Sequence, residues 1–199
     1  MAMKLFDIWE LESVKVQDAG LERYINLSPV LVPRSGGRHA AQPFYKSKTS
    51  IVERLMTKLM VPGHRGKKHV FTSGRATGKY FVNYKVVKSA FEKIEQRTKK
   101  NPVEVFVRAI ENSALREEIA AYQVGGIIVR KSVVTSPQRR IDLALKTIVQ
   151  ASYKKCFGRG EKISSTLANE LIAAAAGDAS KSEAVKEKVR IEREAEGAR

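Results

Sequence analysis

The stretch from Asn101 to Lys146, NPVEVFVRAIENSALREEIAAYQVGGIIVRKSVVTSPQRRIDLALK, decides the fold. Asn101-Pro102 is typical of a helix start, because Asn caps a helix and Pro fits its first position. β-Branched residues then surround Gly125-Gly126, which predicts a β-hairpin over about residues 115–134 with a turn or bulge near the glycines. Ser136-Pro137 begins a second helix. A helix, a hairpin and a helix are therefore expected in succession.

Other helices are predicted on both sides of this stretch. A capping box at Ser50-x-x-Glu53 precedes apolar residues repeated every four positions, and a second apolar stripe with helical spacing runs from Lys79 to Ile94. Another helix begins at Ser164 or Ser165 and ends at Gly177. A capping box at Ser180-x-x-Glu183 opens a last, charged segment. The predicted fold class is mainly α, a bundle of five or six helices with one β-hairpin.

The first 48 residues differ from the rest of the chain. Residues 1–30 alternate loosely between apolar and polar, which favours a short strand or extended arm followed by a turn. Residues 31–48 combine Pro and Gly with several cations, so we expect a basic arm that orders only against a partner. We therefore divide the chain into an N-terminal extension with a basic arm (1–48), a helical core with the hairpin at about 115–134 (49–177) and a C-terminal surface helix or tail (178–199).

Positive charge is concentrated in one third of the chain. The whole sequence has 37 Lys and Arg against 21 Asp and Glu, a net charge of +16 with a pI near 10. Residues 31–100 have 17 basic and 3 acidic residues, whereas residues 1–30 carry a net charge of −2 and residues 178–199 are neutral. A surface that only keeps a protein soluble intersperses positive and negative side chains. This asymmetry of charge therefore indicates a docking face for a polyanion.

The expected polyanion is nucleic acid rather than a membrane. No apolar run approaches the roughly 20 residues that span a bilayer. The first ten residues lack the apolar core of a secretory signal. The single cysteine, Cys156, excludes an internal disulfide and offers no thiolate pair to a metal, and a structural thiol is favoured over a reactive one. These features predict a cytoplasmic protein.

No set of residues is suited to catalysis. Gly74-Arg-Ala-Thr-Gly78-Lys79 resembles a phosphate-binding P-loop, but a P-loop has four residues between its glycines and a Ser or Thr after the Lys, where this chain has three residues and Tyr80. His64 and His69 lack the Cys or carboxylate neighbours that would complete a metal site. We therefore predict no enzyme, no cofactor and no metal. An NTP-dependent enzyme that uses the Gly-Lys loop is the rival to be excluded by an assay of nucleotide hydrolysis.

Basic side chains beside aromatic rings are the remaining signal. They occur at residues 67–71 and at Lys79-Tyr80-Phe81, where the rings are interpreted as core rather than as base-stacking platforms. Arg139 and Arg140 lie in the first turn of a helix, where the helix dipole disfavours cations. Contact with phosphate therefore explains them better than intramolecular stability does. A DNA-binding regulator with the helix over 137–156 in a major groove is the alternative, although this helix has few base-reading Asn or Gln residues.

Several stretches, in chain order, resemble one family. They are SIVERLM (50–56), NPVEVFVRAIEN (101–112), Gly125-Gly126, SPQRRIDLAL (136–145) and LANELIAAA (167–175). With Lys4-Leu-Phe-x-x-Trp9 and Ser35-x-Gly37-Arg38-x-Ala40-Ala41 nearer the N-terminus, they resemble the universal small-subunit ribosomal protein numbered seven, in its archaeal and eukaryotic form. The resemblance covers nearly the whole chain.

This resemblance implies a helical bundle with a protruding β-hairpin and an extended basic N-terminal arm. It also implies a non-enzymatic structural constituent of the small ribosomal subunit. Such a protein binds the head (3′ major) domain of small-subunit rRNA, nucleates head assembly and lies near the exit-site tRNA and the mRNA path. The expected neighbours are other head proteins, those numbered nine, thirteen and nineteen.

By position, RNA contacts are expected at three groups of cations: Arg34, Arg38, Lys46 and Lys48 in the arm; Arg65, Lys67, Lys68, Arg75 and Lys79 in the loop; Arg139 and Arg140 at the helix start. Bacterial members have a basic hairpin tip, whereas residues 119–124 here read IAAYQV. The hairpin residues that could contact tRNA or mRNA are therefore Tyr122, Gln123, Arg130 and Lys131. Recognition should rest mainly on backbone and shape, because RNA helices hide their base edges in a deep groove.

Overall fold

The helix, hairpin and helix expected from residues 101–146 are all present in the computed structural model, which describes residues 3–63 and 76–199. Helix α4 (Pro102–Ser113) begins after Asn101, whose side chain accepts a hydrogen bond from the Val103 backbone N–H at 3.0 Å. Strands β1 (Glu117–Val124) and β2 (Ile127–Val134) pair antiparallel in unbroken register. Gly125 and Gly126 have φ angles of 55° and 87°, the left-handed conformation that a two-residue hairpin turn requires. The turn is therefore confirmed and no bulge is needed.

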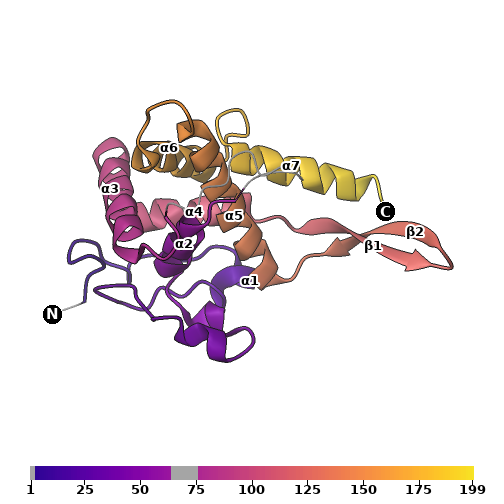
Figure 1. Ribbon diagram of the computed structural model, residues 1–199, viewed down its shortest axis with the longest axis horizontal. Coiled ribbons are helices and arrows are strands. Elements are labelled where there is room, and N and C mark those ends of the chain that lie inside the picture. The colour runs from indigo at the N-terminus through magenta and orange to yellow at the C-terminus, as the bar shows by residue number, and fades with distance from the viewer. Residues whose placement is uncertain (1–2, 64–75) are drawn as a thin grey trace.

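Five longer helices form a bundle around one core (Figure 1). They are α2 (Ile51–Met60), α3 (Tyr80–Thr98), α4, α5 (Pro137–Cys156) and α6 (Ile163–Ala175). Each buries one apolar stripe, as on α5, where Ile141, Leu145 and Ile148 are fully buried. This matches the periodicity of 3.6 residues on which amphipathic helices depend. The mainly α fold class with a protruding hairpin is confirmed.

A sixth helix, α7 (Glu183–Glu196), begins against α4, α5 and α6, where Ala184 and Val185 are buried in the core, and then runs alongside the hairpin (Figure 1). The Ser132 backbone N–H donates to the Ala198 carbonyl at 3.3 Å, and the Arg199 guanidinium pairs with Glu117 at 2.7 Å. The start of α7 is held by Glu170, a fully buried carboxylate that accepts from the Ser182 hydroxyl at 2.8 Å. Hairpin and helix therefore extend from the bundle together.

Two of the expected helix caps are wrong. Ser50 is at the N-cap of α2, but its side chain makes no capping hydrogen bond, and the Glu53 carboxylate accepts instead from Ser35. The last helix is capped by Ser182, whose hydroxyl accepts from the Val185 N–H, rather than by Ser180. Helix α6 also starts slightly earlier than expected, at Ile163. All three helices are present, but Ser182 takes the capping role expected of Ser180, and no side chain caps α2 or α6.

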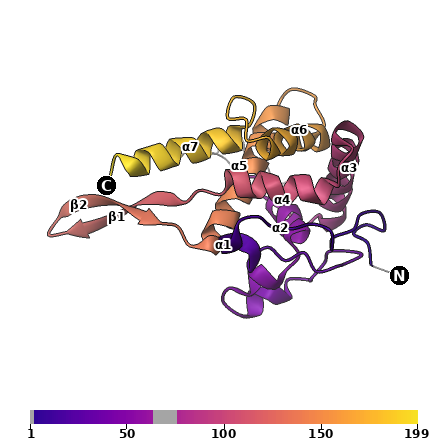
Figure 2. The same cartoon turned by 180° about the vertical axis from the view of Figure 1, so that it is seen from behind.

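Residues 3–30, the described part of the N-terminal segment, form neither a strand nor an extended arm. They include a short helix α1 (Ala19–Glu22), and they bury Leu5, Trp9, Leu21 and other apolar side chains in the common core. Figure 2 shows this segment running below α4 towards α3. The Phe6 ring stacks edge-on against Tyr84 with ring centres 4.7 Å apart. An extended N-terminal arm is therefore not confirmed for these residues.

Within the described residues, no helix is both long and apolar enough to cross a membrane. The same part of the chain holds no cluster of three or more His, Cys, Asp or Glu side chains placed to bind a metal ion.

Candidate nucleic-acid interface

Residues 31–48, here called the basic lobe, fold as two 3₁₀ turns, η1 (Arg38–Ala41) and η2 (Tyr45–Lys48), below α2 (Figure 1). The lobe contains Arg34, Arg38, Lys46 and Lys48 and has no Asp or Glu. From the sequence this segment was expected to order only against a partner, but the structure shows it in defined contact with the bundle. These contacts determine which cations remain free to meet a ligand.

Most anchors of the basic lobe use its neutral groups. The Tyr80 hydroxyl donates to the Pro33 carbonyl at 2.6 Å. The Ser35 backbone N–H and hydroxyl donate to Glu53 at 2.8 and 2.6 Å. The Asn26 amide donates to the Lys48 carbonyl. As a result, no carboxylate of the described residues forms an ion pair with the three exposed cations of the lobe, Arg34, Arg38 and Lys48.

Lys46 is the exception, because it pairs with Asp142 on α5. Asp142 also accepts from the Arg54 guanidinium at 3.0 Å, and Arg54 in turn donates to the Tyr24 carbonyl at 3.1 Å. Burial alone would raise the pKa of Asp142, but the hydrogen bonds from Lys46 and Arg54 outweigh it and hold this pKa below its ordinary value. The ionised cluster therefore joins the lobe to α2 and α5.

A recess of about 150 Å³ opens between the basic lobe, α2 and α5. His39, Lys46, Arg54 and Lys58 line it, with Asp142 as its one carboxylate. Lys58 makes no ion pair with any described residue, and it was not among the cations that the sequence singled out. The sequence signal that could have indicated Lys58 is its position in the strongly basic stretch of residues 31–100. The recess adds positive charge beside the lobe.

Arg139 and Arg140, at the start of α5, have different environments. Arg139 is exposed and forms a two-pronged pair with Glu118, whose second oxygen lies 2.8 Å away. Arg140 is mostly buried and donates to Asp18 at 2.7 Å and to the Leu115 carbonyl at 3.0 Å. The sequence had suggested that intramolecular contacts do not explain Arg139 and Arg140. This is wrong for Arg140, which ties α5 to α1 and to the hairpin base.

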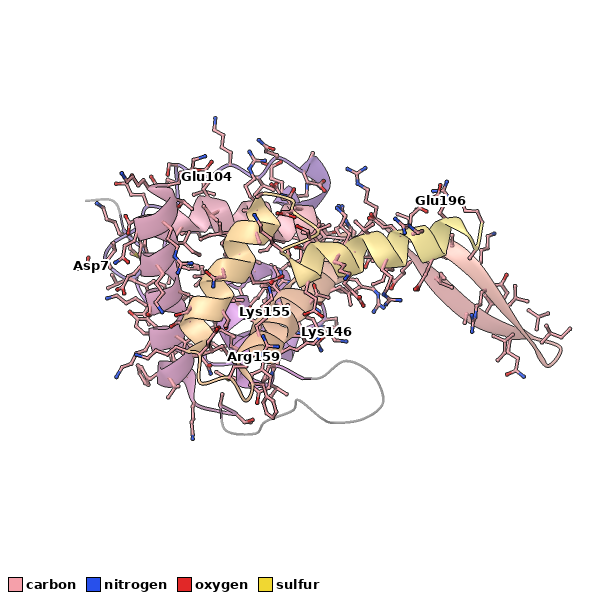
Figure 3. The ribbon with its side chains drawn as sticks, turned by 90° about the horizontal axis from the view of Figure 1, so that it is seen from above. Asp7, Glu104, Lys146, Lys155, Arg159 and Glu196 are labelled. Carbon is pink, nitrogen blue, oxygen red and sulfur yellow. The ribbon has the colours of Figure 1, made fainter. Side chains whose placement is uncertain are left out.

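Along the hairpin, Arg130 and Lys131 are exposed and face Ala121 and Ala120 across the strand pair. Tyr122 and Gln123 are exposed as well, nearer the turn. Figure 3 labels three further cations, Lys146 and Lys155 on α5 and Arg159 in the loop that follows it. Of these, Lys155 is engaged by Glu170, whereas Lys146 and Arg159 are exposed.

Comparison with known proteins identifies the family of this chain. The family model described as Ribosomal protein S7p/S5e matches residues 21–199. The chain belongs to this ribosomal protein family. It is 48% identical to small ribosomal subunit protein uS7 of Nanoarchaeum equitans, over all of both chains. It is 44% identical to the uS7 proteins of Methanothrix thermoacetophila and Archaeoglobus fulgidus, over 99% and 98% of this chain and 100% and 94% of theirs.

Membership of the S7p/S5e family makes the chain a structural, non-enzymatic protein of the small ribosomal subunit, and so of the cytoplasm. Ribosomal RNA and other ribosomal proteins are therefore its partners. Four of the expected RNA-contacting residues, Arg65, Lys67, Lys68 and Arg75, lie outside the described residues, as do His64 and His69. Arg34, Arg38, Lys46 and Lys48 lie in the basic lobe, and Lys79 directly precedes α3, whose Tyr80 is bonded to the lobe. The hairpin extends elsewhere (Figure 1).

Cys156 behaves as a structural thiol within this S7p/S5e chain. Its Sγ donates to the Tyr153 carbonyl at 3.2 Å. Burial raises the pKa of the thiol above its ordinary value, which keeps it protonated and unreactive at neutral pH.

Proposed function

We propose that the chain binds the head (3′ major) domain of small-subunit rRNA, through the basic lobe and the start of α3, and nucleates assembly of the head. The observation that carries the proposal is the lobe itself. It is anchored to the bundle by its neutral groups and by Lys46, while Arg34, Arg38 and Lys48 stay exposed without a carboxylate partner. Unneutralised cations on a fixed scaffold are suited to contacting RNA phosphates.

The β-hairpin serves a second contact in this proposal. It extends away from the bundle in a direction different from that of the basic lobe, as Figures 1 and 2 show. We assign it to the exit-site tRNA and the mRNA path, with Tyr122, Gln123, Arg130 and Lys131 as the contacting residues. The exposed faces of the bundle then remain available to neighbouring head proteins, those numbered nine, thirteen and nineteen.

Binding to RNA fragments tests the proposal. Filter binding should give a tight complex with a transcript of the 3′ major domain and weaker complexes with transcripts of the other domains of the same rRNA. Duplex DNA should not compete at equal phosphate concentration, which also tests the DNA-binding alternative. Equal affinity for all the transcripts, or full competition by DNA, would contradict a specific role in the head.

A further inference from the structure

Phe81 is an exposed aromatic residue in the first turn of α3, with 63% of its surface open to solvent. The core-facing side of the same helix carries Val87 and Phe91, which are fully buried. The sequence had favoured a core position for the rings at 80 and 81. This is wrong for Phe81, and Tyr80 is only half-buried.

The Phe81 ring belongs to a small stack with a cation. The guanidinium carbon of Arg34 lies 5.7 Å from the centre of the Phe81 ring and 5.5 Å from that of Tyr80. The two rings meet edge to face with centres 5.7 Å apart. These distances are within the range of cation–π contacts, so the three side chains form one surface.

This surface is held in place from both sides. The Tyr80 hydroxyl donates to the Pro33 carbonyl, the residue before Arg34. Burial, the largest cause, together with nearby Glu53, raises the pKa of Tyr80 to about 12, so the hydroxyl keeps its proton and its hydrogen bond at neutral pH. The buried side chain of Asn83 donates to the Lys79 carbonyl at 3.1 Å and fixes the first turn of α3. Little ordering entropy would be lost when a ligand arrives.

The charges around Phe81 select the class of ligand. Lys79 and Lys85 are both exposed, and Lys85 lies one helical turn after Phe81 on the same face. Residues 76–91 contain no Asp or Glu, and neither does the basic lobe. An aromatic ring beside an Arg plane and between two lysines suits a nucleotide, whose base stacks on the ring while its phosphates meet the cations.

We propose that an unpaired base of rRNA stacks on Phe81 and Arg34, with Lys79 and Lys85 contacting the adjacent phosphates. The inference rests on the proposed function and deepens it. Recognition at this point then depends on a base that has left its helix, in addition to backbone and shape.

Substitutions at Phe81 test the stack in the full chain bound to the 3′ major domain transcript. Phe81→Ala should weaken binding about ten-fold, which is within the range for the loss of one base–aromatic stack. Phe81→Leu keeps the apolar surface but not the ring, and it should weaken binding nearly as much. Phe81→Trp should bind like the wild-type chain, and its added fluorescence should be quenched by the RNA. Val82→Ala, at an exposed apolar neighbour on α3, is the matched control and should change little.

The salt dependence separates this stack from the electrostatic contacts. Phe81→Ala should lower the affinity at every salt concentration and leave the slope of log K against log salt unchanged, because no phosphate contact is lost. If the wild-type chain binds the transcript tightly and Phe81→Ala binds it equally well, the stack is overturned while the proposed function stands. Normal RNA binding by Phe81→Ala combined with weaker association with another head protein would overturn it too, because Phe81 would then be a protein contact. Failure of the wild-type chain to bind the transcript would instead contradict the proposed function.

Discussion

Arg54 lies beneath the basic lobe with its side chain only 7% exposed, and its guanidinium joins the Tyr24 carbonyl to Asp142. A buried cation of this kind is costly unless both of its contacts are satisfied. Here it links the segment after α1, helix α2 and helix α5, three parts of the chain that support the lobe. Local stability and the position of the candidate RNA interface therefore depend on one side chain.

Replacing Arg54 by Met should reduce the free energy of unfolding by about 2–3 kcal/mol, because Asp142 stays partly buried and keeps only Lys46 as a partner. Lys58→Met on the same helix is the control and should change stability by less than about 0.5 kcal/mol. Urea unfolding followed by circular dichroism measures both. Equal stabilities for the two variants would show that the Arg54 contacts contribute nothing net.

The same cluster predicts how stability depends on acid. The pKa of Asp142 is lower in the folded chain than its ordinary value of 3.8, so folding favours the ionised carboxylate. This contribution is complete above about pH 4 and is lost as the pH falls through the folded pKa. The Tm difference between the wild-type chain and Asp142→Asn should therefore be largest near neutral pH and shrink below pH 4. A difference that is constant from pH 7 to pH 2 would rule out the ionised pair as its source.

At the residue scale, local spacing correctly predicted the helix cap at Asn101 and the turn at Gly125-Gly126. It did not predict the partners of Glu53 and Arg140. A cap or a two-residue turn depends on neighbours in the sequence, so its pattern can be read directly. Glu53 accepts from Ser35 and Arg140 donates to Asp18, 122 residues away. Such partners depend on the path of the folded chain, which no local spacing records.

At the element scale, the hairpin depends on its turn at one end and on α7 along its length. Glu170 holds the start of α7 by accepting from the Ser182 hydroxyl and the Ala184 N–H, and the residues after the end of α7 contact β1 and β2. The sequence predicted the hairpin and a charged last helix, but not that the helix lies beside the hairpin. Charged residues on α7 indicated a solvated surface, and the pairing of Arg199 with Glu117 is a contact between distant segments.

Gly126→Ala should loosen the hairpin without unfolding the bundle. Gly126 has φ of 87°, and a side chain in that conformation costs about 1 kcal/mol or more. Amides of β1 and β2 should then exchange with deuterium about five-fold faster, while those of α4 and α5 are unchanged. Gly197→Ala, where φ is −71°, is the matched control and should leave all these rates alone. Protection that is unchanged in the Gly126 variant would contradict the assigned turn.

At the scale of the whole molecule, the charge distribution and the fold act together. Composition predicted a docking face in residues 31–100. The structure adds that the basic lobe is fixed to α2, α3 and α5 while three of its cations remain exposed, and that the hairpin extends elsewhere. Charge counts give the sign and size of the surface, but only the tertiary contacts determine which cations are already neutralised.

The most direct test of the central claim is the slope of log K against log salt for binding to the 3′ major domain transcript. Replacing Arg34, Arg38 and Lys48 by Ala should flatten this slope by about 2–3, since each lost phosphate contact removes roughly 0.7–0.9. Replacing Lys181, Lys186 and Arg193 in the neutral C-terminal segment removes the same charge and should leave the slope almost unchanged. Equal slopes for the two triple variants would contradict an RNA interface on the basic lobe.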